Sequence, residues 1–343
     1  MNFVDLPVPL EPTYDRSPRT IKDLCKEHIK AITLFTICIV IIIILLAVSM
    51  CLFLTPAKKN VAVLPMKSIT LFLDYYKKLY ITDYDRIVMF SPDSIEKASI
   101  IIGKDSIRLP ILDKPRSIFV DVDENLYVLE VHFDFKEEFY IYRVWYWSKN
   151  STNGKKLLEG NGDCYSLYID KYMNIYIPEN GNHRVVIWYA QQQYQNFSIV
   201  AGNGTSGSEL NQLNEPYGIY LDENNDKFDL YIGDVKNRRI QKWSLNAAEG
   251  ITVVSNVNYP MQIASDCHDN FIVWNGDALK LYNSMLTTGL DGIYLLNNFY
   301  SGAMGYDNKN GAVYICDMTN NKIIKFSIEG EILLHNTKEA PTA

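Results

Sequence analysis

Six strand-like segments that end in aspartate recur along this chain at intervals of 41 to 52 residues. The aspartates are Asp74, Asp121, Asp170, Asp222, Asp266 and Asp307. Each is followed by a short polar turn and a second apolar run, and most units add a third and a fourth run. A four-stranded sheet cannot bury both of its faces alone, whereas sheets arranged radially as blades cover one another. The spacing therefore predicts an all-β domain, a six-bladed β-propeller over residues 65–335.

The polar residues that recur from unit to unit have a structural interpretation. The second apolar run of the units ends at Asp83, Glu130, Glu179, Asp234, Asn275 and Asp317. Aspartate and asparagine in turns accept hydrogen bonds from backbone N–H groups two residues further on. A residue needed in nearly every unit serves the unit, so we expect these side chains to stabilise turns rather than form a catalytic or metal ring. Arg184 and Arg238 follow them in the chain, and we expect each to pair with a carboxylate or to cover a neighbouring blade.

The fourth unit has the most regular pattern. It reads Asn-Glu-Pro-Tyr-Gly-Ile-Tyr-Leu-Asp over residues 214–222, Leu-Tyr-Ile-Gly-Asp over 230–234 and Asn-Arg-Arg-Ile over 237–240. This order of Pro and Gly, two aspartate-ended strands and an Asn-x-Arg-Ile turn resembles the NHL repeat. The resemblance implies an NHL-type β-propeller. It is less specific for function, because NHL propellers bind proteins, RNA or ligands and some are enzymes.

An uncharged run of 25 residues, 31–55, precedes the repeats. As a helix with a rise of about 1.5 Å per residue, it exceeds the roughly 30 Å hydrocarbon core of a bilayer. Five basic residues lie between Arg16 and Lys30, and three follow the run at Lys58, Lys59 and Lys67. This bias predicts one transmembrane helix with a cytoplasmic N-terminus, a single-pass type II protein of the plasma membrane or secretory pathway.

The remaining segments complete the predicted domain organisation. Residues 1–30 contain four prolines and mixed charges and are predicted to be a disordered cytoplasmic tail. Residues 56–64 are a linker in which Val61–Leu64 is a candidate outer strand for the last blade, and residues 336–343 are a flexible C-terminus. Glycosylation sequons begin at Asn150, Asn196 and Asn203, all after the anchor, and we predict that the chain is a glycoprotein.

One insertion breaks the repeat pattern. The second unit carries extra residues between its second and third strands, rich in aromatic side chains. Exposed aromatic residues supply contact area at low entropic cost, which is typical of partner-binding surfaces. The candidate partner surface comprises Phe133, Phe135, Tyr140, Tyr142, Trp145 and Trp147.

The composition narrows the function classes. A net charge of −7 gives no basic face for nucleic acid, so we predict no nucleic-acid partner. The chain has no GxSxG motif, no CxxC motif and no Cys/His cluster, so we predict no catalytic residue, no cofactor and no resident metal. Cys164, Cys267 and Cys316 are an odd number in the domain, which leaves at least one unpaired in the monomer.

The main interpretation is a membrane-tethered binding platform for an unidentified protein or small ligand. The alternative is a propeller hydrolase or lyase, similar to strictosidine synthases, lactonases or peptide-amidating lyases, with a metal in the central channel. The lactonase-like alternative requires Glu, Asn and Asp side chains from several blades in that channel.

Overall fold

The computed structural model describes residues 59–63, 70–82, 86–91, 94–103, 106, 108, 110, 112, 114–223, 228–265, 270–283, 292–296, 301–307, 309–317 and 322–327. All of them belong to one compact unit, residues 56–343. The predicted tail, anchor and C-terminal segment lie outside the described residues. Within those residues, no helix has both the length and the hydropathy to span a membrane.

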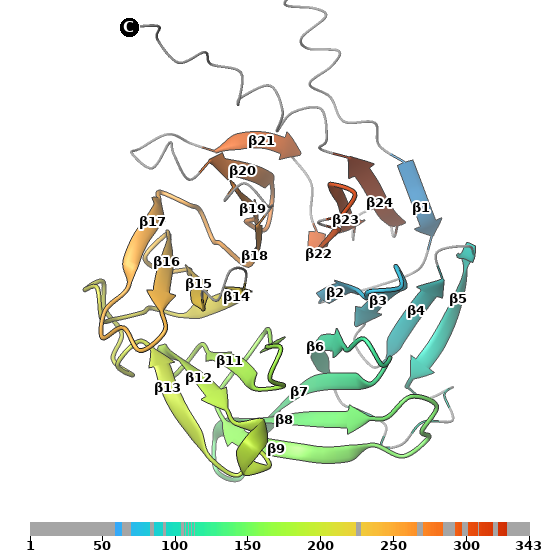
Figure 1. Cartoon of the computed structure of the whole chain (residues 1–343), viewed down its shortest axis with the longest axis horizontal. Helices are drawn as coiled ribbons and strands as arrows, with labels where there is room; N and C mark the ends of the chain where they lie inside the picture. Colours follow the sequence, from blue (N-terminus) through green and yellow to red (C-terminus); the bar gives the residue numbers. More distant parts are fainter. Residues whose placement is uncertain are drawn as a thin grey trace, which may run out of the picture. The chain divides into compact units, whose positions relative to one another are not determined.

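The unit consists of six four-stranded antiparallel sheets arranged around a central axis (Figure 1). Blade 1 contains β2 (Thr70–Leu73), β3 (Leu79–Thr82), β4 (Ile87–Ser91) and β5 (Ser94–Ile102). Blade 2 contains β6 (Pro115–Val120), β7 (Leu126–Asp134), β8 (Phe139–Trp147) and β9 (Lys155–Asn161). Blade 3 contains β10 (Tyr168–Ile169), β11 (Ile175–Glu179), β12 (Arg184–Trp188) and β13 (Phe197–Ala201), with the short 3₁₀ helix η1 (Ala190–Gln192) before β13.

Blade 4 contains β14 (Pro216–Asp222), β15 (Asp229–Asp234), β16 (Arg239–Ser244) and β17 (Ile251–Ser255). Blade 5 contains β18 (Gln262–Ser265), β19 (Asn270–Trp274), β20 (Leu279–Asn283) and β21 (Ile293–Leu296). Blade 6 contains β22 (Ser301–Asp307), β23 (Ala312–Asp317), β24 (Lys322–Ser327) and β1 (Lys59–Val63). The predicted all-β, six-bladed propeller is thus confirmed.

The hydrophobic core is divided among the blade interfaces. Six clusters of buried residues each join one blade to the next. The cluster between blades 2 and 3, for example, packs Val131 and Val144 against Ile175, Ile177 and residues around them. Both faces of each sheet are therefore covered, which is why the strands read as continuous apolar runs rather than as a strict alternation.

The first strand of the domain closes the ring. β1 pairs with β24, with Ala62 opposite Ile323 and Val63 opposite Lys322. It becomes the outermost strand of blade 6, so that blade combines the two ends of the domain sequence and leaves no open gap between blades 6 and 1.

Strand direction gives the propeller two distinct faces. We call the loop face the one at which the second strands end, with Glu130, Glu179 and Asp234. We call the turn face the opposite one, which carries the tight turns that begin at Asp121 and Asp170. Because β1 is antiparallel to β24, Lys59 lies at the turn face and Val63 toward the loop face.

Candidate functional site

The repeated aspartates at the ends of the first strands stabilise the turns. Asp121 Oδ1 accepts the backbone N–H groups of Asp123 at 3.0 Å and Asn125 at 2.8 Å. Asp170 Oδ1 does the same for Tyr172 at 2.9 Å and Asn174 at 2.7 Å. These carboxylates are occupied by their own turns, as the repeat predicts, so they offer nothing to a ligand.

Asp74 and Asp307 act in similar turns. Asp74 accepts the N–H of Lys78 at 2.7 Å, and burial raises its pKa. Asp307 accepts the N–H of Lys309 at 3.1 Å and pairs with Lys77 of blade 1. Asp83 and Asp266 lie outside the described residues, and Asp317 is buried at the end of β23.

The arginine that pairs with Asp234 is Arg239 and not Arg238. Asp234 is fully buried; its Oδ1 accepts the N–H of Asn214 at 2.7 Å, and its Oδ2 accepts Arg239 Nε at 2.7 Å. Arg238 is exposed, sits in the turn with a φ of +54° and forms no ion pair with a described residue. The backbone of Arg238 lies in the left-handed region, so β16 begins one residue later, at Arg239. It is the Arg239 side chain that points at Asp234. Burial raises the pKa of Asp234, against the opposing hydrogen bonds from Asn237, Asn214 and Arg239.

The equivalent pair in blade 3 links two blades. Arg184 Nε donates to Glu179 Oε2 at 2.6 Å, and the hydroxyl group of Tyr142 in blade 2 donates to Glu179 Oε1 at 2.8 Å. Trp188 Nε1 donates to the Tyr142 hydroxyl at 3.2 Å. Glu179 therefore acts as a buried connector between blades 2 and 3.

The aromatic insertion forms the long β7–β8 hairpin on the loop face, but only part of it is surface. Tyr142 and Trp147 are completely buried in the core, and half-buried Trp145 donates to Glu130 Oε2 at 2.8 Å. Including Tyr142 and Trp147 in a partner surface is wrong, because neighbouring blades cover them. For partly exposed Trp145 this role stays a prediction.

The hairpin tip extends beyond the last paired residue of β9, Asn161, which lies opposite Ile141. There Phe133 packs edge-on against Phe135 and Tyr140, with ring centroids 5.1 and 5.0 Å apart. Phe135 is 87% exposed. A role of this tip in partner binding stays a prediction.

The central channel contains a cavity of about 380 Å³ lined by the innermost strands of the blades. Its hydroxyl and amide groups cross-link neighbouring inner strands. Ser117 Oγ accepts the N–H of Leu167 at 3.3 Å, and the Ser166 hydroxyl donates to the carbonyl group of Tyr217 at 2.6 Å. Gln262 Oε1 accepts the N–H of Met304 at 2.5 Å.

The described channel lining does not fit a metal centre. It contains hydroxyl, amide, aromatic and aliphatic side chains, and no Asp, Glu, Asn or His. Throughout the part of the chain that the structure describes, no three His, Cys, Asp or Glu side chains come together as a metal site. Calcium requires several oxygen ligands, usually carboxylates, and zinc requires His, Cys or carboxylate.

At the loop-face end of the channel, three blades contribute a stack of planar groups. The guanidinium group of Arg116 lies 4.7 Å from the ring centroid of Tyr165, which stacks on Tyr217 with centroids 4.3 Å apart. Tyr165 donates to Asp163 Oδ2 at 2.7 Å. Arg116 Nε and Asp163 Oδ1 are buried without a hydrogen-bond partner among the described residues. Burial raises the pKa of Tyr217 to about 12.

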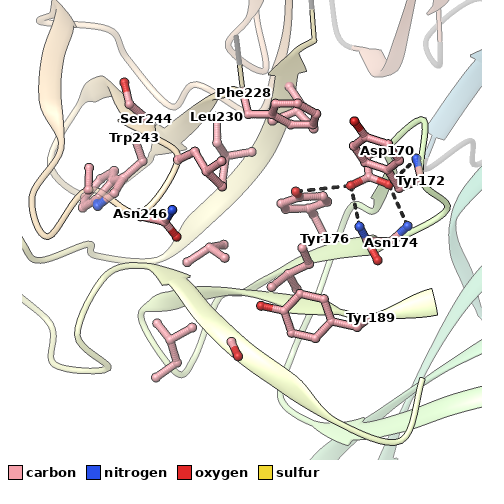
Figure 2. A pocket seen from close by; sticks show the side chains of 17 residues that line it. Asp170, Tyr172, Asn174, Tyr176, Tyr189, Phe228, Leu230, Trp243, Ser244 and Asn246 are labelled. Atoms are coloured by element: carbon pink, nitrogen blue, oxygen red, sulfur yellow. Dashed lines mark hydrogen bonds between the residues drawn. The ribbon is translucent and has the colours of Figure 1, made fainter. Parts of the chain in front are cut away.

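A groove of about 690 Å³ lies on the turn face between blades 3 and 4 (Figure 2). Twelve of its 17 lining residues are aliphatic or aromatic. Its inner part is formed by core side chains of both blades, including Ile187, Leu230 and Trp243. Its rim carries exposed Tyr172 and Leu245, and Tyr172 stacks on Phe228 with centroids 5.8 Å apart. We name this cavity the blade 3–4 groove.

The polar groups in the blade 3–4 groove are largely committed to the protein. Asp170 is bound by its own turn, and the hydroxyl group of Tyr176 donates to it at 3.4 Å. Burial, together with the Asp170 charge, raises the pKa of Tyr176. Asn174 Oδ1 accepts the N–H of Ala190 at 3.0 Å, and Ser244 donates to Asp229 at 2.6 Å. The rest of the lining is mostly apolar, with Tyr189, Ser198 and Asn246 as further polar residues.

One cation lies at the rim of this groove. Lys171 Nζ is 5.5 Å from the ring centroid of Tyr172 and 4.9 Å from that of Phe228. Its backbone N–H donates to Glu223 at 2.9 Å, and burial raises the pKa of that carboxyl group. The groove thus combines apolar walls with one charged amine near its opening.

The sequence analysis did not find the blade 3–4 groove. Its walls come from two repeats. The sequence context of each lining residue, taken alone, predicts only a core position or a turn. The one available signal was local: Tyr172 gives the turn of the third unit an aromatic residue that most other units lack.

The sequon asparagines Asn150, Asn196 and Asn203 are all exposed, as glycosylation requires. Their modification stays a prediction. Cys164 is a buried free thiol, Cys316 is buried, and Cys267 lies outside the described residues. Burial raises the pKa of Cys164, which makes it a poor nucleophile.

Comparison with known proteins supports the fold alone. No protein-family model matches the chain, and no curated protein matches it in sequence. Among solved structures, it is similar to a gluconolactonase from Xanthomonas campestris, with a TM-score of 0.57 and 10% identity over 79% of this chain and 89% of that one.

It is also similar to a protein proposed to be a gluconolactonase (TM-score 0.54, 11% identity, 80% and 94% coverage). A streptogramin B lyase gives the same TM-score and identity, with coverage of 80% and 98%. These likenesses establish the propeller architecture. Membership of the NHL family stays a prediction.

Proposed function

We propose that this protein is a ligand-binding propeller and that its ligand is an elongated apolar group held in the blade 3–4 groove. The observation that carries the proposal is the cavity of about 690 Å³ with predominantly apolar walls. That volume lies within the range of about 300–1,000 Å³ typical of small-molecule sites, which are likewise mostly apolar.

The chemistry of the lining defines the ligand class. The side chains of Asp170, Asn174 and Ser244 form hydrogen bonds within the protein, which leaves Tyr189, Ser198 and Asn246 as polar lining residues among mostly apolar ones. Burial of apolar surface is the main free-energy gain on offer, at roughly 25 cal/mol per Å².

The test is a titration with cis-parinaric acid, a fluorescent fatty acid whose emission rises in apolar surroundings. It uses residues 56–343, a compact unit that contains all six interblade cores. Leu245→Ser, at the groove rim, is expected to weaken binding about tenfold, equivalent to about 1.4 kcal/mol of lost apolar contact.

The matched control is Ile251→Ser. Ile251 is 62% exposed and Leu245 is 65% exposed, both in blade 4, but Ile251 does not line the groove. Equal affinities for the two variants, or no fluorescence increase with the unmodified protein, would show that the groove is not a ligand site.

A second candidate, a propeller hydrolase or lyase, is favoured by the fold comparisons over a membrane binding platform. The structural neighbours are described as gluconolactonases and a lyase. The described channel does not supply the ligand set of a metal-dependent enzyme. The residues best placed to contact a substrate are Arg116 and Asp163 at the channel mouth, each with a buried polar atom lacking a partner among the described residues.

An assay of glucono-δ-lactone hydrolysis separates this candidate from the binding function. We expect no turnover above the uncatalysed rate, with or without added Ca²⁺. Turnover that disappears in Asp163→Asn while the melting temperature is retained would make the enzyme the correct interpretation.

The tether is a further part of the proposal. We propose that residues 31–55 anchor the chain with the propeller outside the cytosol, on the basis of the uncharged run and the charge bias beside it. The net charge of −7 does not favour a nucleic-acid partner.

A further inference from the structure

The exposed apolar side chains are unevenly distributed between the two faces. On the turn face they occupy turns and strand ends of blades 1 to 4. They are Tyr75, Tyr76, Val122, Tyr172, Phe197, Leu245 and Ile251. The loop face carries Phe135, Phe139 and Tyr140 at the β7–β8 hairpin tip, and Tyr294 of β21 lies opposite Lys280, nearer the loop face. Contiguous exposed apolar surface marks a protein, ligand or membrane contact.

The turns that carry these residues are connected across blades. The hydroxyl group of Tyr76 in blade 1 donates to the carbonyl group of Val122 in blade 2 at 3.2 Å. Lys77 pairs with Asp307 in blade 6, and the N–H of Lys171 in blade 3 donates to Glu223 in blade 4 at 2.9 Å. The turns of blades 1 and 2, of blades 6 and 1, and of blades 3 and 4 are thus linked to each other.

Several turn-face aromatic rings are accompanied by a lysine. Lys309 Nζ is 4.0 Å from the ring centroid of Tyr75, and Lys78 Nζ is 5.9 Å from that of Tyr76. Lys171 covers Tyr172 in the same way at 5.5 Å. Amphipathic aromatic rings with lysines that extend their amines toward water are typical of the membrane–water interface.

Several acidic groups of this face bind groups within it. Asp121 and Asp170 accept backbone N–H groups of their own turns. Glu124 pairs with both Lys78 and Lys149. These lysines offset part of the negative charge on the described turn face.

The chain enters the propeller at the same face. β1 begins at Lys59, at the turn face, and the uncharged run ends at Thr55. Four residue steps span at most about 14 Å when fully extended. A membrane anchor at residues 31–55 would therefore leave only a short connection to the turn-face end of β1, which lies beside β24 (Figure 1).

We propose that the turn face rests on the bilayer surface, with its aromatic turn residues in the headgroup region, and that the apolar ligand of the blade 3–4 groove is a lipid acyl chain. The assignment of a lipid acyl chain rests on the ligand-binding function proposed above. The contact with the bilayer rests on the anchor. The β7–β8 hairpin and the channel mouth then face away from the membrane. Two sequons, Asn150 and Asn196, lie in turn-face loops, so the proposal assigns glycosylation to Asn203 on the loop face.

The test is lipid photocrosslinking with the full chain reconstituted in vesicles of phosphatidylcholine that carry an alkyne tag. The photoreactive residue p-benzoylphenylalanine replaces Tyr76 in one sample and Tyr172 in a second. In the control it replaces Phe135, which is 87% exposed at the hairpin tip on the opposite face. All three positions are exposed aromatic residues, so the substitution leaves the folded core intact.

The expected result is at least tenfold more tagged lipid on the protein from the Tyr76 and Tyr172 positions than from the Phe135 position. Equal labelling at all three positions, labelling only at Phe135, or no labelling would overturn the proposal. Protein–protein adducts in place of lipid adducts at Tyr76 would show that the face binds a partner protein instead. A glycan on Asn150 or Asn196 would also overturn it.

The two proposals fail separately. If cis-parinaric acid binds the groove but Tyr76 and Tyr172 do not label lipid, the groove is a ligand site on a face that does not contact the membrane. If lipid labelling is found but Leu245→Ser binds cis-parinaric acid as well as Ile251→Ser does, the face contacts the bilayer and the groove is not the ligand site.

Discussion

Replacing Asp234 by alanine is the sharpest test of how the repeated polar residues act. The Asp234 carboxylate is fully buried and accepts three hydrogen bonds. They come from the N–H of Asn214 at 2.7 Å, Asn237 Nδ2 at 2.8 Å and Arg239 Nε at 2.7 Å. Asp234→Ala leaves a buried N–H group unsatisfied and removes the partner of a buried cation.

The magnitude follows from what remains around that cation. Breaking a buried ion pair costs roughly 3–5 kcal/mol. The guanidinium group of Arg239 also donates to the carbonyl groups of Ser208 at 2.8 Å, Glu209 at 3.0 Å and Gln212 at 2.9 Å. These contacts keep part of the charge solvated, so we expect the low end, about 3 kcal/mol. At about 2 °C per kcal/mol for a large domain, the melting temperature should fall by about 6 °C.

The assay is a thermal melt followed by circular dichroism, with a matched arginine control. Arg238→Ala, at the exposed position, should shift the free energy of unfolding by no more than about 0.5 kcal/mol. The double variant Asp234→Ala with Arg239→Ala should be more stable than the sum of the two single losses predicts, because it removes the uncompensated charge. Equal shifts in melting temperature for Asp234→Ala and Arg238→Ala would refute the assignment of Arg239 as the partner of Asp234.

Two further predictions concern stability. Gly160→Ala should cost about 1–3 kcal/mol by overpacking, since its Cβ atom would lie 2.3 Å from the buried Tyr142 ring. Gly181→Ala, which meets no atom within 4 Å, should be neutral in the same melt. Burial alone would raise the pKa of Asp307, but the hydrogen bond and charge of Lys77 lower it below the usual value. The resulting stabilisation is present above about pH 4 and lost as the pH falls through the lowered pKa, so Asp307→Asn should show a smaller acid-induced drop in melting temperature. An unchanged acid profile in that variant would exclude this carboxylate as a source of acid sensitivity.

The architecture could be predicted from the sequence because the contacts that produce it are local and repeated. The Asp121 and Asp170 turns are closed by hydrogen bonds to residues two and four positions further on, so the sequence signal and the contact coincide. The spacing between such turns gives the number of residues in one blade, and six blades account for the domain. Strand-to-strand pairing within each blade likewise joins neighbours in sequence, with the exception of β1.

Side-chain exposure was harder to predict from the sequence, because both faces of every blade are covered by other blades. Tyr142 and Phe135 both belong to the aromatic insertion, yet one is completely buried and the other is 87% exposed. The difference depends on where β9 ends beside the hairpin, which no pattern within the insertion encodes. The choice between Arg238 and Arg239 has a similar origin. A single left-handed residue in the turn shifts which arginine enters the strand and points at Asp234.

The sequence by itself determined the repeat, the turn chemistry and the predicted anchor, since each depends on residues close together in the chain. Tertiary structure decided where ligand-sized space exists and which face carries it. The blade 3–4 groove joins Tyr172 and Ile187 of one unit to Phe228 and Leu245 of the next, over distances in sequence that periodicity does not connect. The sidedness of the propeller was decided in the same way. The antiparallel pairing of β1 with β24 brings Lys59 to the face that carries the exposed aromatic turns, because strand direction fixes the end at which the chain enters the ring.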